Sequence, residues 1–471
     1  MQSILVLLFA LAFWTAPASA YQIFQGPPAG KASDTFVQVS PDGEPLTGAN
    51  SLSIVPGDSA AIDAAGRQRV SLPIGVFEDK RLYGTGEGIH WLSSIVGDGA
   101  SVTFLPNEDS VSITIGTASG ERVFRESRYL PYIPGKSASI KITGVFGAAV
   151  PNLTRRLGYY NDENGLFFQQ AGTVVGVGLR TSTSGSPVDT VVPQSSWNLD
   201  RLDGSCALTP VYRCAKTSNP SGITLDTTKV QLFTIDFLWQ GVGRVRYGLQ
   251  LNGRTVYVHE VMNSNVKPTV FIGSPSLPIR YEIVNTGIST GGTLKQICVS
   301  VDSEGGYTPP GLEFAAANGI SVRAITTVAP VLAIRLATSF GGKANRKIAR
   351  ILHLAGRATT NDAFCELRHI HGVTGTTGGE WVAVSTESAV EVNTGVTSIT
   401  SDRSHTLDIN YAVSGQGQSS STFSESLSYI SDHSIIHQNI DSSSSQYFAI
   451  YCTSFSGTSN LSFEINWQEY D

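Results

Sequence analysis

One aspartate stands inside a dense apolar run, where a carboxylate could do chemistry: Asp236, within Thr234–Trp239. Retaining hydrolysis of a glycosidic bond needs two carboxyl groups about 5–5.5 Å apart. A strand that reads Glu-x-Asp-x-x-Glu can supply them, because its first and third positions share one face. Here Thr234 and Trp239 occupy both glutamate positions. We therefore expect no such hydrolase and interpret Asp236 as a hydrogen-bonded strand residue.

Two histidine pairs have spacings that metal sites use. His369 and His371 alternate as on one face of a strand, and His433 and His437 have the spacing of one helix turn. Neither pair has a carboxylate or thiol nearby at a matching spacing, so we expect surface histidines and no metal. A phosphate-binding loop, a nucleophile elbow and a dinucleotide fingerprint are also missing from the sequence, so no cofactor is expected.

Four aromatic residues could stack on a sugar ring if one cleft exposed them together: Tyr159, Tyr160, Trp197 and Trp239. The same residues need no ligand if they pack in a core. We favour the core interpretation and keep glycan contact as the alternative.

The five cysteines allow several arrangements. Cys206 and Cys214 bracket a short insertion and could close a small disulfide loop. Cys365 and Cys452 could pair across the C-terminal region, which would leave Cys298 as a buried thiol. The alternative is that all five are isolated packing residues.

The clearest element is a hairpin. Val245, Tyr247, Leu249 and Leu251 alternate with polar residues or glycine, and Asn252-Gly253 is the pair that best forms a type I′ turn. This turn would place Leu249 opposite Val256, Tyr247 opposite Val258, and Arg246 opposite His259.

Composition favours many short strands. The chain has 471 residues, of which 48 are glycine and only 15% are charged, so it lacks the material for long polar helices. The formal charge of −6 gives no reason to expect nucleic-acid binding. Ile4–Trp14 followed by Ala18-Ser19-Ala20 resembles an export signal, with an uncleaved anchor or arm as the alternative. We expect no stable membrane span once it is removed.

Seven blocks follow one another between residues 61 and 310: DAAGRQRVS (63–71), RYLPYIPGKS (128–137), RRLGYYNDENGLFF (155–168), LDGS (202–205), SGITLDTTKVQLFTIDFLWQGVGRVRYG (221–248), LPIRYEIVNTG (277–287) and LKQICVSVDSEGGY (294–307). Together they resemble a family of virion structural proteins of tailed bacteriophages and some large DNA viruses. The resemblance implies a particle component and no reaction. The hairpin block also resembles jelly-roll sandwiches of the concanavalin-like lectin type.

We therefore expect an all-β protein with a jelly-roll or concanavalin-like central sandwich followed by a second β-sandwich. The expected parts are a signal-like segment (1–20), an extended arm (21–62), the central domain (63–308) and the C-terminal domain (312–471). The first hypothesis is a non-enzymatic virion protein that assembles with copies of itself and other virion proteins. The alternative is a secreted or surface lectin-like adhesin that binds host-surface glycans, in an exported or extracellular location.

Overall fold

The computed structural model describes residues 23–25, 36–38, 62–70, 72–80, 83–88, 90–205, 218–305, 311–319, 323–414, 421–422, 435–437 and 446–470. The chain divides into two units, 1–59 and 60–471. In the first, β1 (Ile23–Gln25) and β2 (Phe36–Gln38) pair antiparallel. The expected signal segment, 1–20, lies outside the described residues. Among the described residues, no helix has the length and apolar character to cross a membrane.

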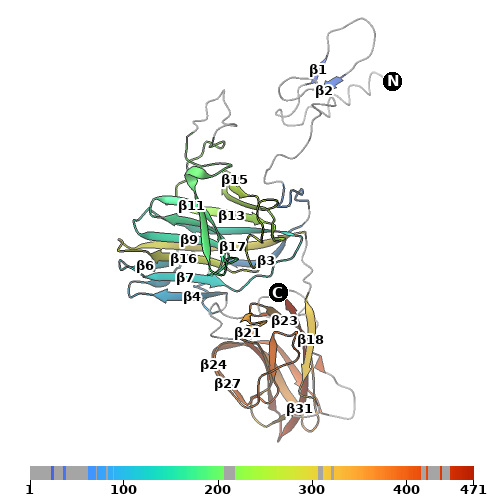
Figure 1. The fold of residues 1–471 in the computed structure, drawn as a ribbon. Helices are drawn as coiled ribbons and strands as arrows, with labels where there is room; N and C mark the ends of the chain where they lie inside the picture. The colour runs from blue at the N-terminus through green and yellow to red at the C-terminus, as the bar shows by residue number, and fades with distance from the viewer. Residues whose placement is uncertain are drawn as a thin grey trace, which may run out of the picture. The chain divides into compact units, whose positions relative to one another are not determined.

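Two antiparallel sheets form a central sandwich, drawn from blue to yellow in Figure 1. The seven-stranded sheet has the order β12 (Val188–Pro193), β11 (Val174–Thr181), β10 (Gly165–Ala171), β9 (Leu153–Tyr160), β16 (Ile279–Asn285), β7 (Arg122–Ser127), β4 (Trp91–Val96). The eight-stranded sheet has the order β15 (Arg254–Val261), β14 (Val245–Leu251), β13 (Gln231–Phe237), β8 (Ser137–Val145), β17 (Gly292–Glu304), β6 (Ser110–Ile115), β5 (Ser101–Leu105), with β3 (Ile74–Lys80) also paired to β17.

The apolar face of each sheet points inward, because alternate residues of a strand lie on opposite faces. On β13 the inward residues are Phe233, Ile235 and Phe237, all buried. Phe168 of β10 meets Phe233 across the interior, with ring centroids 4.8 Å apart. Thr234 and Asp236 consequently point out of the sandwich, away from this core.

The predicted hairpin is confirmed, with one correction. Asn252 and Gly253 have φ of 52° and 77°, as a type I′ turn requires, and Leu249 pairs with Val256. A β-bulge between Tyr247 and Gly248 then shifts the register by one residue. Tyr247 therefore lies opposite His259, and Arg246 opposite Glu260, so those two predicted pairs are wrong.

A second sandwich follows, built from two six-stranded sheets. One contains β18 (Leu312–Ala317), β31 (Ser459–Tyr470), β23 (Ile348–Ala358) and β28 (Ser421–Thr422), with β19 (Arg323–Ile325) and β29 (Ile435–Ile436) attached. The other has the order β25 (Val382–Ala383), β26 (Val390–Asn393), β20 (Ala329–Leu336), β30 (Tyr447–Ser454), β24 (Ala363–Thr377), β27 (Ser398–Ala412). The short strands β21 (Ser339–Phe340) and β22 (Lys343–Ala344) pair separately. Among the described strands, no pairing joins this sandwich to the central one.

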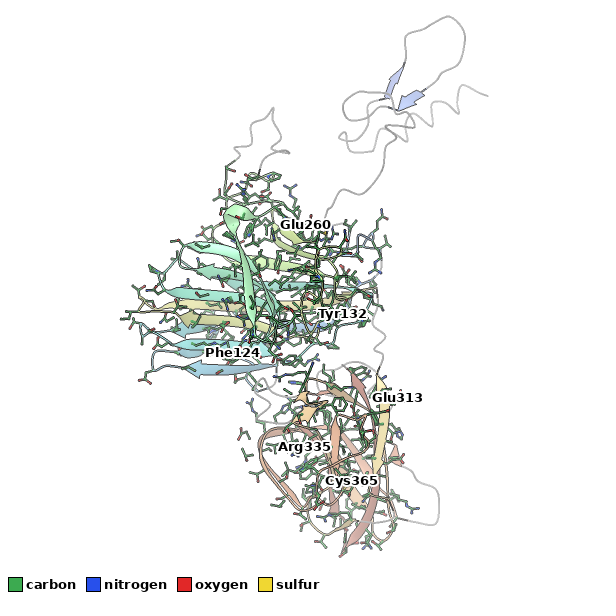
Figure 2. The ribbon with its side chains drawn as sticks, in the orientation of Figure 1. Phe124, Tyr132, Glu260, Glu313, Arg335 and Cys365 are labelled. Carbon is green, nitrogen blue, oxygen red and sulfur yellow. A yellow bond between two sulfur atoms is a disulfide. The ribbon has the colours of Figure 1, made fainter. Side chains whose placement is uncertain are left out.

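The disulfide of this second sandwich is Cys365–Cys452, which confirms one of the two predicted pairings. The two residues lie opposite each other on β24 and β30, and Figure 2 labels Cys365. The prediction for Cys298 is wrong, since this thiol is exposed. A bulge on β17 between Gln296 and Val299 turns Val299 inward in its place. Cys206 and Cys214 lie outside the described residues.

Candidate functional site

A row of polar residues crosses the outward face of the eight-stranded sheet. Asp236 of β13 lies between Arg246 of β14 and Ser139 of β8, and Asp302 of β17 lies on the far side of Ser139. The neighbouring strands therefore bring together residues from four separate parts of the chain.

Asp236 is the centre of this row and is completely buried. Its Oδ2 accepts hydrogen bonds from Arg69 Nη2 at 2.6 Å, from Arg246 Nη2 at 3.3 Å, and from the Tyr257 hydroxyl. Its Oδ1 is also buried, yet it accepts no hydrogen bond from any described residue. Thr234 Oγ1, two residues earlier on the same face, is also buried and has no hydrogen-bond partner among the described residues. Such atoms are uncommon in folded proteins, because each one forfeits hydrogen bonds that water would otherwise supply.

Arg69 reaches this face from the segment 62–70. Asp63 Oδ1 accepts hydrogen bonds from the backbone N–H of Ala65 (2.9 Å) and Arg67 (2.8 Å), which closes a tight turn. Arg246 Nη2 donates to the Ile62 carbonyl at 2.6 Å and holds the turn against the sheet. The segment contains nearly all of the DAAGRQRVS block, and these contacts hold it on the outward face of the sheet. We call residues 62–70 the clamp.

Glu304, at the end of β17, is a second carboxylate beside the same guanidinium. Arg69 Nε lies 2.5 Å from Glu304 Oε1, and Arg69 Nη2 lies 3.5 Å from Glu304 Oε2. Because Nη2 also lies 2.6 Å from Asp236 Oδ2, the Asp236 and Glu304 oxygens are within about 6 Å of each other. Burial raises the pKa of the Glu304 carboxyl; Arg69 opposes that shift, and the charge of Asp236 adds to it.

The accessible part of the site continues along β8 and β17. Lys141 Nζ lies 2.7 Å from Asp302 Oδ2, and Ser300 Oγ donates to the same oxygen at 3.2 Å. The Lys141 side chain is 37% exposed, whereas Asp236 is inaccessible. The face therefore runs from a buried charged end to an open end that can meet a ligand.

The four aromatic candidates from the sequence do not share one cleft. Tyr159 lies in the core and donates to the Pro275 carbonyl at 2.8 Å, and Trp197 is buried in the same core. Tyr160 lies on the outward face of the other sheet, where it donates to Glu282 at 3.2 Å. Trp239 is half-buried and packs edge-on against Tyr132, labelled in Figure 2, with centroids 6.3 Å apart.

The prediction that the paired histidines are surface residues is wrong for the His369–His371 pair. His369 and His371 were predicted to be surface residues, but both are buried, because β24 turns this face toward the interior of its sandwich. His405 of β27 joins them. His437 is also buried, and His433 lies outside the described residues.

The sequence pointed to Asp236 but missed its partners. Arg69 and Glu304 stand in the blocks 63–71 and 294–307, which were singled out for resemblance and not for chemistry. A spacing pattern along one strand can place a second carboxylate only on β13, whereas the structure supplies Glu304 from β17. No local spacing could have indicated that pair.

Comparison with known proteins gives a likeness of fold only. No family model and no curated protein matches the chain. Similar solved structures include a β-1,3-glucanase from Mycobacterium marinum (TM-score 0.32, 12% identity, 48% of this chain and 98% of that chain). Others are a glycosyl hydrolase family 16 protein from Mycobacterium smegmatis (0.30, 10%, 48% and 100%) and a legume lectin-like domain from Entamoeba histolytica (0.25, 9%, 45% and 89%).

The expected all-β class is confirmed by the sheets themselves, which form a central antiparallel sandwich followed by a second β-sandwich. The prediction that the protein is not an enzyme is corrected, because the solved structures similar to the chain include glucanases and a glucuronan lyase. At these TM-scores and identities they assign no activity to this chain. Paired carboxylates can come from different strands, so the absence of both glutamates from Thr234–Trp239 does not exclude catalysis.

Proposed function

We propose that the protein is a lectin-like glycan-binding protein of an oxidising, extracellular setting. Its binding site would be the outward face of the eight-stranded sheet, from Asp236 and Glu304 to Lys141 and Asp302. The observation that carries this proposal is the charged cluster on this face, which ends in the partly exposed pair of Lys141 and Asp302 (Nζ–Oδ2 2.7 Å). Burying charges is unfavourable for stability compared with apolar packing, so such a cluster is better explained by recognition than by folding.

Sugar hydroxyls suit this chemistry because each both donates and accepts hydrogen bonds. Carboxylates such as Asp302 accept from a hydroxyl, while Lys141 donates to it, and these charge-assisted bonds are the stronger kind. A site built to hydrogen-bond hydroxyl groups rejects ligands that lack them, because its own polar groups would then be left unpaired. The disulfide Cys365–Cys452 supports the oxidising setting.

A glycan array with the full-length protein tests the proposal. Lys141→Met and Asp302→Asn alter the open end of the site, and each is expected to weaken binding about tenfold, which is the loss of one charge-assisted hydrogen bond. Asp189→Asn is the matched control, since Asp189 forms a similar ion pair with Arg180 (2.7 Å) on the other sheet. The proposal fails if no glycan is retained, or if the control weakens binding as much as the site variants do.

A second candidate function is cleavage of the bound glycan. It is favoured by the upper limit of about 6 Å on the distance between the Asp236 and Glu304 oxygens, because this limit admits the spacing of about 5–5.5 Å found in retaining glycosidases. Glu304, whose pKa is raised, would protonate the leaving oxygen as the glycosidic bond breaks. Asp236 would form the new bond to the anomeric carbon, and water would then hydrolyse that ester with Glu304 as the base.

Cleavage requires Arg69 to leave the space between the two carboxylates. A reducing-end assay on a panel of polysaccharides therefore compares the wild type with Arg69→Ala and Glu304→Gln. Cleavage that increases in Arg69→Ala and disappears in Glu304→Gln would support this function. If neither the wild type nor Arg69→Ala produces reducing ends, cleavage is excluded as a function, and the proposal of glycan binding is unaffected.

The virion resemblance stays a prediction. Neither the described residues nor the comparisons support a particle component that assembles from copies of itself. Mass spectrometry of purified particles would test it, since a structural protein should be present there in stoichiometric amounts.

A further inference from the structure

Three histidines meet inside the C-terminal sandwich. His369 and His371 share the inward face of β24, and His405 of β27 lies directly opposite His369. The ring centroids are 4.0 Å apart for His369–His371, 5.2 Å for His369–His405 and 5.1 Å for His371–His405. One ring nitrogen from each histidine lies within 4.8 Å of the other two. Two of these three closely packed imidazole groups, those of His369 and His371, are buried.

One of these rings is held in a defined tautomer. His369 is 2% exposed, and its Nε2 lies 3.1 Å from Gln446 Oε1. An amide oxygen only accepts, so Nε2 carries the hydrogen and Nδ1 carries the lone pair. The Gln446 amide nitrogen lies 3.3 Å from His437 Nε2, which fixes the orientation of the amide. His369 Nδ1 is buried and has no hydrogen-bond partner among the described residues.

This arrangement matches the support that metal-binding histidines have. A ligating histidine donates its other ring N–H to an acceptor, which fixes the tautomer and orients the ring. Gln446 accepts the Nε2 hydrogen of His369 in this way, so the lone pair on His369 Nδ1 is available to bind a metal ion. Burial lowers the pKa of His369 well below its usual value, and the neighbouring histidines add to that shift. A neutral imidazole with a lone pair on one ring nitrogen is the form that coordinates a metal.

We propose that His369, His371 and His405 bind one divalent transition-metal ion of the zinc class. Tetrahedral zinc with Zn–N bonds of ~2.0–2.1 Å places its ligand nitrogens ~3.4 Å apart, so small ring rotations are enough to close the cluster. Imidazole ligands favour Zn²⁺, Co²⁺, Ni²⁺ and Cu²⁺ over Mg²⁺ and Ca²⁺, which prefer oxygen. Three protein ligands leave a fourth position for water or an incoming ligand.

The test uses full-length protein without a histidine tag, dialysed against EDTA and studied above the ordinary histidine pKa of about 6.5. It is titrated by calorimetry with Zn²⁺, and by visible absorption with Co²⁺, whose tetrahedral complexes are coloured. We expect one equivalent of either metal per chain, and no binding of Mg²⁺ or Ca²⁺. His371→Gln and His405→Gln should each weaken binding at least tenfold. Gln446→Leu, which leaves all three ligands in place, should weaken it about 10–100-fold.

His259→Gln is the matched control, because His259 is a buried histidine of the central sandwich, outside the cluster. It should bind metal as the wild type does. Hydrogen exchange of β24 shows which variants keep the sandwich folded, and Gln446→Leu keeps the test decisive if a histidine variant does not fold. The proposal is overturned if the folded wild type binds no Zn²⁺ or Co²⁺. It is also overturned if the affinity is the same in the folded cluster variants and in His259→Gln.

Discussion

The charge cluster around Asp236 makes a quantitative prediction for Asp236→Asn. This change keeps the size of the side chain and removes its charge, so Arg246, which is fully buried, loses the countercharge that Asp236 provides. Breaking a buried ion pair by removing one partner destabilises a protein by about 3–5 kcal/mol, because the remaining charge stays out of water. We expect the free energy of unfolding of the central sandwich to fall by about 4 kcal/mol, or close to a thousandfold in the unfolding equilibrium.

Hydrogen exchange read by mass spectrometry is the appropriate assay, because a chain with two sandwiches need not unfold in a single step. Peptides from β13 and β14 report the central sandwich, and peptides from β24 and β30 serve as an internal reference. Glu108→Gln is the control: Glu108 pairs with Lys295 in the same sheet but is exposed, so its exchange protection should not change.

A double-mutant cycle tests the cause of the loss. If the lost attraction between Asp236 and Arg246 is responsible, Asp236→Asn combined with Arg246→Met should lose less stability than the two single changes added together, by about 2 kcal/mol. A loss below about 1 kcal/mol in Asp236→Asn, or strict additivity in the cycle, would refute the reasoning.

Three further predictions concern the rest of the fold. Replacing Cys365 and Cys452 by alanine opens a loop of sequence separation 87, which should destabilise the C-terminal sandwich by about 4.5 kcal/mol; unchanged exchange protection of β24 and β30 would contradict this. His369 has a lowered pKa in the folded state, so the unfolded chain takes up its proton first, and stability should fall below about pH 6.5 by at most ~1.4 kcal/mol per pH unit. Urea unfolding in EDTA measures this slope, and a slope no smaller in His369→Gln than in the wild type would disprove its assignment to His369. Gly158→Ala should destabilise the central sandwich by about 2–3 kcal/mol, because a Cβ would overlap the Leu166 carbonyl oxygen. Gly375→Ala is the control and should be tolerated, because the space around Gly375 is open. A similar loss of stability in both variants would show that this overlap is not the cause.

The clamp formed by residues 62–70 explains how a surface face comes to hold buried charges. Arg69 belongs to this segment, and Arg246 donates a hydrogen bond to the carbonyl of Ile62 in the same segment. Both arginines contact Asp236. The same contacts limit access to the carboxylate pair. Glycan binding at the open end near Lys141 does not depend on moving the clamp, whereas cleavage does, so the two proposed functions can be separated experimentally.

Local sequence patterns determined the strands and the tight turn of this protein. The predicted Asn252-Gly253 turn is confirmed, because alternation and turn preference act over a few neighbouring residues. Local pattern leaves some segments open: the run KIARILHL (347–354) suits a strand or a short helix equally, and pairing of β23 with β31 makes it a strand.

Only the tertiary structure decided which residues meet. Alternation shows which face a side chain takes, but it does not show which strands become neighbours. Asp236 and Glu304 approach each other because β8 lies between their strands, and His405 reaches His369 because β27 pairs with β24. The bulge in the β14–β15 hairpin changed even a short-range register by one residue, since an extra residue on one strand is set by packing and not by the local pattern.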